Sequence, residues 1–355
     1  MKRIYVTHIA PREKTIELKI SLSATNFNYN LIGGGFFDKT YSILPAFVTG
    51  KHRFDDSANL EYIYSDWRYK NRIARKLAPL IENISLYKRI EKNTSVWFYN
   101  VTTLNILTML LLLLFRRRSV QVNLIVLDYT PTEFLHKCLL PIINRCHGRI
   151  LLAKSPLFKK ENAVLLPGVT PENGVVYPVV EAIKKEFLIS GVLSENIAML
   201  SMLLPAFSKM PDCTLHVTGM IENDAWIKEY ADKYLNIRYH GCVPYDEYLA
   251  ILHSTPFLLS TRNPAFPENQ CNFPSKIIEA LLHNRIVVST LHYDQLGDIR
   301  YLEVPSEETA FVDAIKQIAN KSEDELLSYA NQSEKVRQMF SVEVWEKVMR
   351  NIEQG

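Results

Sequence analysis

The chain has 355 residues, of which 47% are hydrophobic, and its formal net charge is +3. This length and composition provide for two buried cores and exclude a wholly disordered chain. The longest apolar run, residues 109–115, is too short to span a membrane, and residues 1–8 read as a strand rather than a signal peptide. Five cysteines without disulfide or metal spacing indicate buried thiols in a reducing compartment. We therefore expect a cytoplasmic protein.

Charge is distributed unevenly along the chain. Residues 1–168 contain 25 Lys and Arg against 12 Asp and Glu, a balance of +13, whereas residues 169–355 contain 16 against 26, a balance of −10. A basic first half indicates a polyanionic partner, such as a membrane surface, a lipid pyrophosphate or a nucleic acid. Because no nucleic-acid-binding motif accompanies the charge, we expect no nucleic-acid partner.

The first half begins with an expected strand at residues 4–7, followed by a polar, Asn-rich segment at residues 11–30 that predicts a hairpin or a long loop. Gly33, Gly34 and Gly35 then precede a helix-like stretch at residues 36–44. Three successive glycines would let the backbone approach an acceptor or donor phosphate. A plain flexible turn fits them nearly as well.

Two segments of the first half combine basic and apolar residues. Residues 66–77 predict a helix with one basic face, formed by Arg68, Arg72, Arg75 and Lys76. Residues 104–115 are apolar nearly all round and are followed by three arginines at 116–118. A solvated face for the first segment and packing on a sheet for the second are ordinary alternatives. The balance of +13 favours binding to a membrane surface, with the four basic residues facing it.

The rest of the first half predicts strands at residues 95–99, 122–127, 150–155 and 163–167, the second of which ends at Asp128. A link between domains is expected near residues 167–178. We therefore expect a first domain over residues 1–168.

The second half alternates strands and helices. Strands are expected at residues 187–191, 214–219, 236–241 and 256–260, and helices at residues 196–207, 224–234 and 245–253. Such alternation predicts a parallel sheet covered by helices, which binds its ligands at the carboxyl ends of its strands. Gly191, Gly219, Gly241 and the segment 260–276 all fall at those ends.

Residues 272–290 predict an anion-binding helix start followed by a buried strand. Pro274 suits the first turn of a helix, and Asn284 can adopt the left-handed conformation that ends it. The free N–H groups of the first turn, with Lys276 beside them, suit a phosphate. Glu279 lies one turn later on the same face and suits a ribose diol. The alternative is a first turn with a solvated Lys276–Glu279 pair.

From residue 186 to 353 the chain resembles a family 4 glycosyltransferase of the GT-B fold. The family signature is two glutamates separated by seven residues, of which Glu279 matches the second, while Cys271 stands at the first. Residues 272–276 read Asn-Phe-Pro-Ser-Lys, as in a bacterial subgroup. The resemblance implies that Glu279 holds the donor ribose and that Gly241 to Val243 lie along the base. It also implies that the backbone of five residues holds pyrophosphate and sugar: Asn272, Phe273, Pro274, Ser275 and Lys276.

By this resemblance the chain is an α/β protein with two Rossmann-like, doubly wound domains and a cleft between them. An acceptor domain would cover residues 1–168 and a nucleotide-sugar domain residues 169–340. The segment from Phe340 to Trp345 resembles the start of the family's closing helix, which would cross back to the first domain as residues 341–355.

The chain departs from the family in further places. The segment from Gly191 to Asn196 lacks the usual Arg and Lys, and no histidine precedes Asp128. A departing diphosphate needs positive charge, which only Lys276 and Arg262 are placed by sequence to supply. Arg262 could equally be a solvated loop residue. Glu268 is the nearby carboxylate that could replace the missing first glutamate.

These features predict a retaining, metal-independent glycosyltransferase that moves a sugar from a UDP- or GDP-sugar to a bacterial surface glycan, such as a capsule or O-antigen. No cofactor is expected beside the donor. We expect a polyprenyl-pyrophosphate-linked acceptor and a peripheral position at the inner face of the cytoplasmic membrane. Two alternatives remain: a catalytically silent GT-B subunit that binds glycan or activates a partner transferase, and a nucleotide-sugar epimerase of the same fold.

Overall fold

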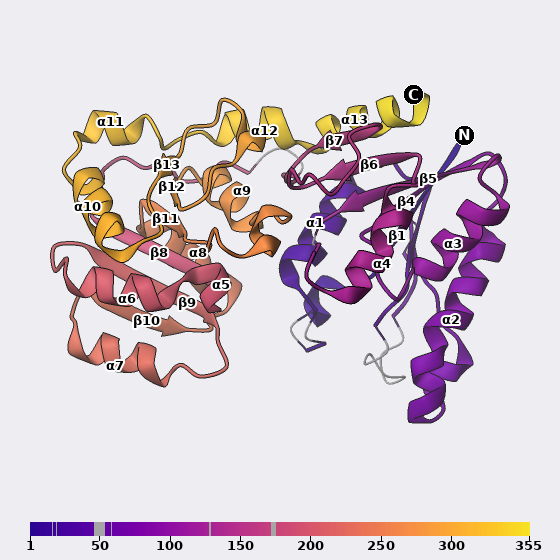
Figure 1. Cartoon of the computed structure of the whole chain (residues 1–355), viewed down its shortest axis with the longest axis horizontal. Helices are drawn as coiled ribbons and strands as arrows, with labels where there is room; N and C mark the ends of the chain where they lie inside the picture. The colour runs from indigo at the N-terminus through magenta and orange to yellow at the C-terminus, as the bar shows by residue number, and fades with distance from the viewer. Residues whose placement is uncertain (16, 19, 46–53, 58, 128, 172–174) are drawn as a thin grey trace. The chain divides into compact units, whose positions relative to one another are not determined.

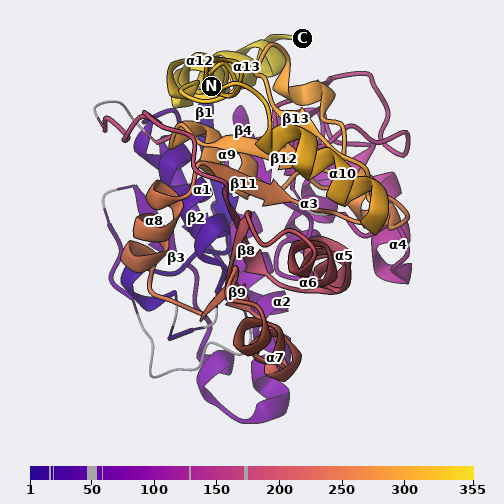
Figure 2. The same cartoon turned by 90° about the vertical axis from the view of Figure 1, so that its left-hand side faces the viewer.

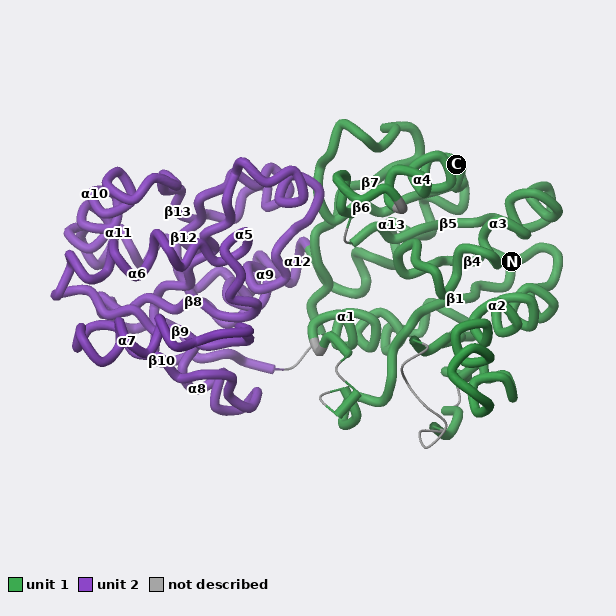
Figure 3. The backbone as a smooth tube through the Cα atoms, turned by 60° about the horizontal axis from the view of Figure 1, so that its bottom comes forward, with its two compact units in different colours: residues 1–172, 340–355 green, residues 173–339 purple. Residues whose placement is uncertain are grey.

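The computed structural model describes the whole chain except residues 16, 19, 46–53, 58, 128 and 172–174 (Figure 1). The chain divides into two compact units (Figure 3): unit 1 comprises Met1–Glu172 and Phe340–Gly355, and unit 2 comprises Asn173–Met339. Asp128 and the middle of the expected link at residues 167–178 lie outside the described residues. In the described part of the chain, no helix has both the length and the hydropathy needed to cross a bilayer.

Unit 1 is built on a sheet of seven parallel strands in the order β3-β2-β1-β4-β5-β6-β7. The strands are β1 (Lys2–Thr7), β2 (Lys39–Ser42), β3 (Leu60–Tyr62), β4 (Thr94–Tyr99), β5 (Val120–Val126), β6 (Gly148–Leu151) and β7 (Ala163–Leu165). Their order is that of a doubly wound Rossmann sheet with one added edge strand. The expected strands at residues 4–7, 95–99, 122–127, 150–155 and 163–167 are confirmed, with shifted ends.

The helices of unit 1 are α1 (Leu22–Gly33), α2 (Arg72–Arg89), α3 (Ile106–Phe115), α4 (Phe134–Ile143) and α13 (Val342–Gln354), with short 3-10 turns η1 (Arg12–Lys14) and η2 (Asp66–Tyr69). The hairpin or long loop expected at residues 11–30 is therefore wrong from residue 22 onwards, where α1 begins. Ser21 caps α1 by accepting a hydrogen bond from the N–H of Ala24. The buried Asn28 accepts hydrogen bonds from the hydroxyls of Tyr5 and Thr7, at 2.7 and 2.6 Å. Tertiary bonds of this kind outweigh the low helix propensity of asparagine.

The three consecutive glycines end α1 instead of opening a helix, and the helix expected at residues 36–44 is replaced by β2. Gly35 has a φ of +74°, which suits the chain reversal after α1. A Cβ atom on Gly34 would lie 2.0 Å from Cγ1 of Val342, so this glycine permits close packing against α13. The glycines stand at the carboxyl end of a helix, where the helix dipole repels anions. Their placement thus favours a packing role over the expected phosphate loop.

Helix α13 closes unit 1 after the chain has passed through unit 2. Trp345 is fully buried and donates a hydrogen bond from Nε1 to the carbonyl of Gly168, at 2.7 Å. Near the other end of the helix, the Glu353 carboxylate accepts hydrogen bonds from Arg3 and Trp97, at 2.8 and 3.1 Å. These contacts join residues more than 170 positions apart and fix the end of the chain to the sheet of unit 1.

Unit 2 has six parallel strands in the order β10-β9-β8-β11-β12-β13, again the Rossmann order. The strands are β8 (Glu186–Val192), β9 (Thr214–Met220), β10 (Ile237–Gly241), β11 (Phe257–Ser260), β12 (Ile286–Ser289) and β13 (Leu302–Glu303). The first five were expected from the sequence and are confirmed.

The helices from residue 195 to 340 are α5 (Glu195–Ala198), α6 (Leu200–Ser208), α7 (Ala225–Lys233), α8 (Tyr245–Ser254), α9 (Ser275–Leu282), α10 (Glu308–Ala319), α11 (Glu323–Leu327) and α12 (Ser333–Phe340), with 3-10 turns η3 (Pro267–Gln270) and η4 (Asp294–Leu296). Helices α6 and α7 cover one face of the sheet, and α8 lies on the other (Figure 2). The single helix expected at residues 196–207 is broken, because Met199 takes a left-handed conformation with a φ of +47°.

Candidate functional site

The candidate site lies at the carboxyl edge of the unit 2 sheet, beside the switch point between β8 and β11. Strand order reverses there, and open α/β sheets bind ligands at such points. Gly191, Gly219 and Gly241 stand at the ends of β8, β9 and β10, and all three have positive φ. A Cβ atom on Gly219 would lie 1.9 Å from the carbonyl oxygen of Gly191, so a side chain is excluded there. Space around Gly191 and Gly241 is open, which leaves their backbone accessible.

Helix α9 places two charged side chains at this edge. Pro274 precedes its first residue, and the buried Ile277, Ile278 and Leu281 anchor it to the sheet. Asn284, with a φ of +65°, ends the helix as expected and leads into β12. Lys276 and Glu279 lie one turn apart on the partly exposed face, and Lys276 Nζ lies 2.8 Å from Glu279 Oε2.

Glu279 is the centre of a hydrogen-bond network that joins α9 to α8. Its carboxylate accepts hydrogen bonds from the hydroxyls of Tyr245 and Tyr248, at 3.2 and 2.9 Å, in addition to that from Lys276. Burial raises the pKa of Glu279, but the charge and hydrogen bond of Lys276 and the Tyr248 hydroxyl outweigh burial and leave the pKa below its ordinary value. The carboxylate is therefore ionised at neutral pH and available to accept hydrogen bonds.

Tyr245 and Tyr248 were not identified from the sequence. They lie at the start of α8 and reach Glu279 from 34 and 31 residues away. The Lys276 ammonium lies 3.9 Å from the centre of the Tyr248 ring, a cation–π distance. Burial and the neighbouring Glu279 charge raise the pKa of both tyrosines, so both hydroxyls stay protonated and act as donors.

Arg262 follows β11 and is held by the loop that precedes α9. Its Nη1 donates to Oδ1 of Asn269 at 3.1 Å, and its carbonyl accepts from the Thr290 hydroxyl at 2.7 Å. Asn269, which the sequence did not single out, is buried and also donates to the carbonyl of Asn196 at 2.9 Å. The loop after β11 is thereby fixed to the start of α5, at the end of β8.

The position of the missing first glutamate carries a buried thiol in place of a carboxylate. Cys271 is buried, and its N–H donates to the carbonyl of Glu268 at 3.0 Å. Glu268 lies on η3, one turn before the segment that leads to α9. After β8, where a cation would be expected, Glu195 accepts a hydrogen bond from the backbone of Ser201 at 3.1 Å. In the described residues, no cluster of three or more His, Cys, Asp or Glu side chains could hold a metal ion.

A histidine that the sequence did not single out lies at the carboxyl edge of the unit 1 sheet. His8 directly follows β1, and its Nδ1 lies 3.1 Å from the carbonyl of Ile43. Its Nε2 lies 3.0 Å from the Thr102 hydroxyl and 3.1 Å from the Asn105 amide. Because Nδ1 faces a carbonyl, it carries the proton and Nε2 accepts. Burial lowers the pKa of His8 to about 4, so the ring is neutral and is held in place by three neighbours.

The basic face expected at residues 66–77 is only partly present, and the prediction for Arg68 is wrong. Arg68 lies on η2, which is separate from α2, and is fully buried. Its guanidinium pairs with the buried Glu82 through bonds of 2.9 and 2.5 Å and donates to the carbonyls of Leu44 and Pro45. Arg75 is half-buried, whereas Arg72 and Lys76 are exposed on α2. Charge pattern alone could not separate a buried ion pair from a solvated face.

No protein-family model and no curated protein sequence matches the chain. Solved structures do match it over nearly its whole length. Sucrose-phosphate synthase from Thermosynechococcus elongatus aligns with a TM-score of 0.67 at 13% identity, covering 100% of this chain and 98% of that one. HepE from Anabaena, in complex with UDP, aligns with a TM-score of 0.61 at 12% identity, covering 100% of both chains. The pneumococcal O-GlcNAc transferase GtfA, in complex with UDP and GlcNAc, aligns with a TM-score of 0.62 at 11% identity, covering 99% of both.

These similarities and the two Rossmann-ordered sheets show the same architecture. The chain has the GT-B fold, with two parallel-sheet domains flanked by helices.

Proposed function

We propose that this chain is a retaining glycosyltransferase that binds a nucleoside-diphosphate sugar at the carboxyl edge of unit 2. The observation that carries the proposal is the ionised Glu279 carboxylate beside Lys276, on the first turns of a helix that starts at this edge. The solved structures with the same fold include HepE with UDP-glucose and GtfA with UDP and GlcNAc. They support a UDP-sugar over a GDP-sugar as the donor.

The proposed contacts follow from the chemistry of each group. The Glu279 carboxylate accepts hydrogen bonds from the ribose hydroxyls, and the backbone of residues 241–243 lies along the base. The N–H groups at the start of α9 and the backbone of residues 272–276 hold the diphosphate and sugar. Open space at Gly191 lets the sugar or phosphate approach the backbone at the end of β8.

Positive charge must lie beside the diphosphate as the glycosidic bond breaks. Lys276 supplies it, with Arg262 as a second cation across the loop that follows β11. We propose that these groups act in place of a metal ion. The leaving phosphate accepts the proton of the attacking acceptor hydroxyl on the same face of the sugar, which retains the anomeric configuration.

The proposed acceptor is a lipid-linked bacterial surface glycan, of the kind that forms a capsule or an O-antigen. The balance of +13 over residues 1–168 supports an acceptor with a phosphate-containing lipid, presented at an anionic membrane surface. The enzyme would then act as a peripheral protein at the inner face of the cytoplasmic membrane.

A second candidate, the catalytically silent subunit, is favoured by one observation. Glu195 takes the place of a cation after β8, and its carboxylate is used to hold the start of α6. Such a subunit would bind a nucleotide or glycan without turning it over.

The test is binding of UDP and GDP to the full chain by calorimetry, followed by assay of nucleoside diphosphate release from a panel of sugar nucleotides. The proposed transferase binds UDP and releases it only when an acceptor, such as a polyprenyl-pyrophosphate-linked sugar, is supplied. Binding without release under all donor and acceptor combinations would favour the silent subunit. Conversion of a donor to its isomer without any acceptor would identify an epimerase.

A further inference from the structure

Helix α2 carries an apolar stripe on the face that points away from the sheet. Ile73, Leu77, Leu80 and Ile84 repeat at helical spacing and are exposed, by 73% for Ile73 and 48% for Leu80. The opposite face of the helix is buried through Ala74, Ala78, Glu82 and Leu86. The exposed Arg72 and Lys76 flank the stripe on one side. An apolar stripe bordered by cations is typical of a helix that lies at the surface of an anionic bilayer.

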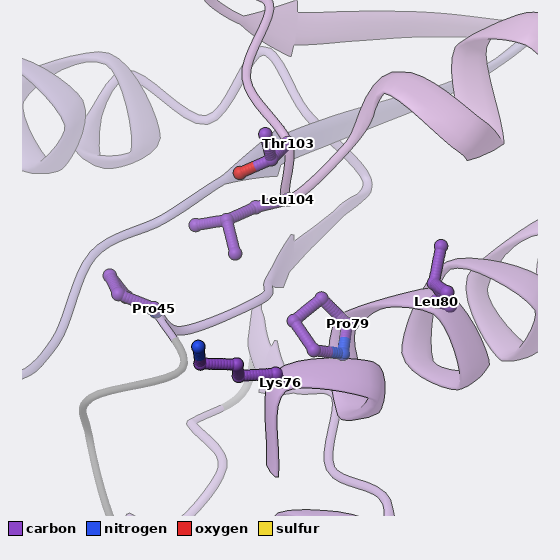
Figure 4. A pocket seen from close by; sticks show the side chains of 6 residues that line it. All are labelled: Pro45, Lys76, Pro79, Leu80, Thr103 and Leu104. Atoms are coloured by element: carbon purple, nitrogen blue, oxygen red, sulfur yellow. The ribbon is translucent and has the colours of Figure 1, made fainter. Parts of the chain in front are cut away.

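A pocket of about 420 Å³ opens beside this stripe (Figure 4). It is lined by Pro45, Lys76, Pro79, Leu80, Thr103 and Leu104. Leu80 and Lys76 therefore belong to both the pocket and the exposed face of α2. Pro45 follows β2, and Thr103 and Leu104 follow β4, so the pocket lies at the carboxyl edge of the unit 1 sheet, where such sheets bind ligands.

The residues that line the pocket combine apolar side chains with one cation and one hydroxyl. Four of the six residues are apolar, one is a cation and one carries a hydroxyl. In Figure 4 the Lys76 ammonium points towards Pro45 and the space below Leu104. Within the part of the chain that the structure describes, no carboxylate forms an ion pair with Lys76. A free sugar would need several polar partners, and a free phosphate would gain nothing from the apolar walls.

We propose that this pocket binds the phosphate and first carbons of a lipid-linked acceptor, which enters from a bilayer that lies against the α2 stripe. The Lys76 ammonium pairs with the phosphate, and the Thr103 hydroxyl donates to it. Leu80, Leu104 and the two prolines contact the hydrocarbon chain. This inference rests on the proposed function for the identity of the acceptor, but the pocket and its chemistry are independent of unit 2.

The probe is farnesyl phosphate, which joins one phosphate to a short isoprenoid chain, used below its micelle concentration with the full chain. Farnesol and inorganic phosphate serve as the chain-only and anion-only ligands. We expect farnesyl phosphate to bind at least about tenfold more tightly than either. We expect Lys76→Gln and Leu80→Ser each to weaken this binding by about tenfold, while Lys88→Gln, on the exposed part of α2 away from the pocket, leaves it unchanged.

Equal binding of inorganic phosphate and farnesyl phosphate would overturn the proposal in favour of a simple anion site. Equal losses in the Lys76 and Lys88 variants would overturn it in favour of unspecific charge attraction. All three positions are exposed, so circular dichroism should report an unchanged fold. UDP binding, measured on the same samples, separates the two claims. UDP binding without farnesyl phosphate binding would contradict the proposed lipid-phosphate pocket alone. Farnesyl phosphate binding without UDP binding would contradict the proposed donor site alone.

Discussion

Lys276 and Glu279 form an ion pair of 2.8 Å on α9, so the cation and the carboxylate assigned to the donor bind each other in this structure. A diphosphate at the start of α9 would compete with Glu279 for the Lys276 ammonium, and ribose hydroxyls would compete with Lys276 for the carboxylate. Donor binding is therefore an exchange of partners. Each charge stays paired in this exchange, because the diphosphate replaces Glu279 beside Lys276 and the ribose hydroxyls replace Lys276 beside Glu279.

Replacement of Glu279 tests the ribose contact. In Glu279→Gln the amide oxygen can keep the hydrogen bonds from Tyr248 and Lys276, and the amide NH2 can donate to the Tyr245 hydroxyl oxygen, so we expect the fold to be retained. Hydrogen bonds from ribose to a neutral amide are weaker than those to a carboxylate, and UDP binding should weaken by about tenfold in calorimetry. Glu229→Gln, on the exposed face of α7, is the matched control and should bind UDP like the unmodified chain. An unchanged dissociation constant in Glu279→Gln would remove this residue from the site.

Replacement of Lys276 tests charge stabilisation of the leaving group. Lys276→Ala should lower turnover by about 100-fold, since a contact of this type contributes about 3 kcal/mol to the transition state. Binding of uridine, which carries no phosphate, should change little. Lys228→Ala, at an exposed ion pair on α7, is the control. Full turnover in Lys276→Ala would transfer the role to Arg262, whose own alanine variant would then carry the loss.

Buried histidines predict that the protein loses stability in mild acid. Burial lowers the pKa of His283, next to the Arg285 and Lys276 charges, and that of His216, next to His240, each to about 4. Between pH 6.5 and 4 the unfolded chain binds protons at these rings and the folded chain does not. The free energy of unfolding is therefore fully retained above pH 6.5 and falls as the pH drops towards 4, by on the order of 3 kcal/mol for each ring.

Urea unfolding at pH 7 and pH 5 measures this loss. His283→Gln removes one titrating ring and should make the decrease in unfolding free energy shallower, even if the variant is less stable at pH 7. A decrease as steep as that of the unmodified chain would show that His283 does not contribute.

The sequence predicted most of the sheet strands because they are runs of β-branched and aromatic residues bounded by glycine or proline. It missed β2 because residues 36–44 fit a short helix equally well. It missed β3 and β13 because segments of three and two residues are too short to show an alternating pattern. It missed α1 because the hydrogen bonds of Asn28 to Tyr5 and Thr7 come from a strand some 20 positions earlier in the chain. Local pattern carries no information about such partners.

The candidate site also contains residues that the sequence predicted and residues that it missed. Lys276 and Glu279 were predicted to lie on one helix face because their spacing alone brings them together, and they do form a pair. Tyr245, Tyr248 and Asn269 reach the site through tertiary packing, and their spacing gave no signal. Arg68 was predicted to lie on an exposed basic face because its neighbours in the sequence are basic. It is instead paired with the buried carboxylate of Glu82, 14 residues later, which the local pattern does not reveal.

The buried pair of Arg68 and Glu82 predicts a large effect on stability from a single substitution. Arg68→Met leaves the Glu82 carboxylate buried without its cation, which should lower the free energy of unfolding by about 3–5 kcal/mol. Arg68→Met combined with Glu82→Gln removes both charges and should recover much of this loss. Urea unfolding of the single and double variants measures the difference. A single variant as stable as the unmodified chain would contradict a structural role for Arg68.

Membrane binding should respond to a different pair of residues. Arg72 and Lys76 are exposed beside the α2 stripe. Each basic group near an anionic bilayer contributes about 1 kcal/mol to binding. Neutralising both residues with glutamine should therefore weaken vesicle binding by about 30-fold. Co-sedimentation with vesicles of phosphatidylcholine and phosphatidylglycerol, at low and high salt, measures this loss. Lys228→Gln with Lys233→Gln, which removes two charges from α7 of the acidic half, is the matched control and should bind like the unmodified chain. Equal binding by all three proteins, or no binding to anionic vesicles at low salt, would leave the basic first half without this role. The acceptor would then be sought among soluble glycans, since nothing would bring the first domain to a lipid.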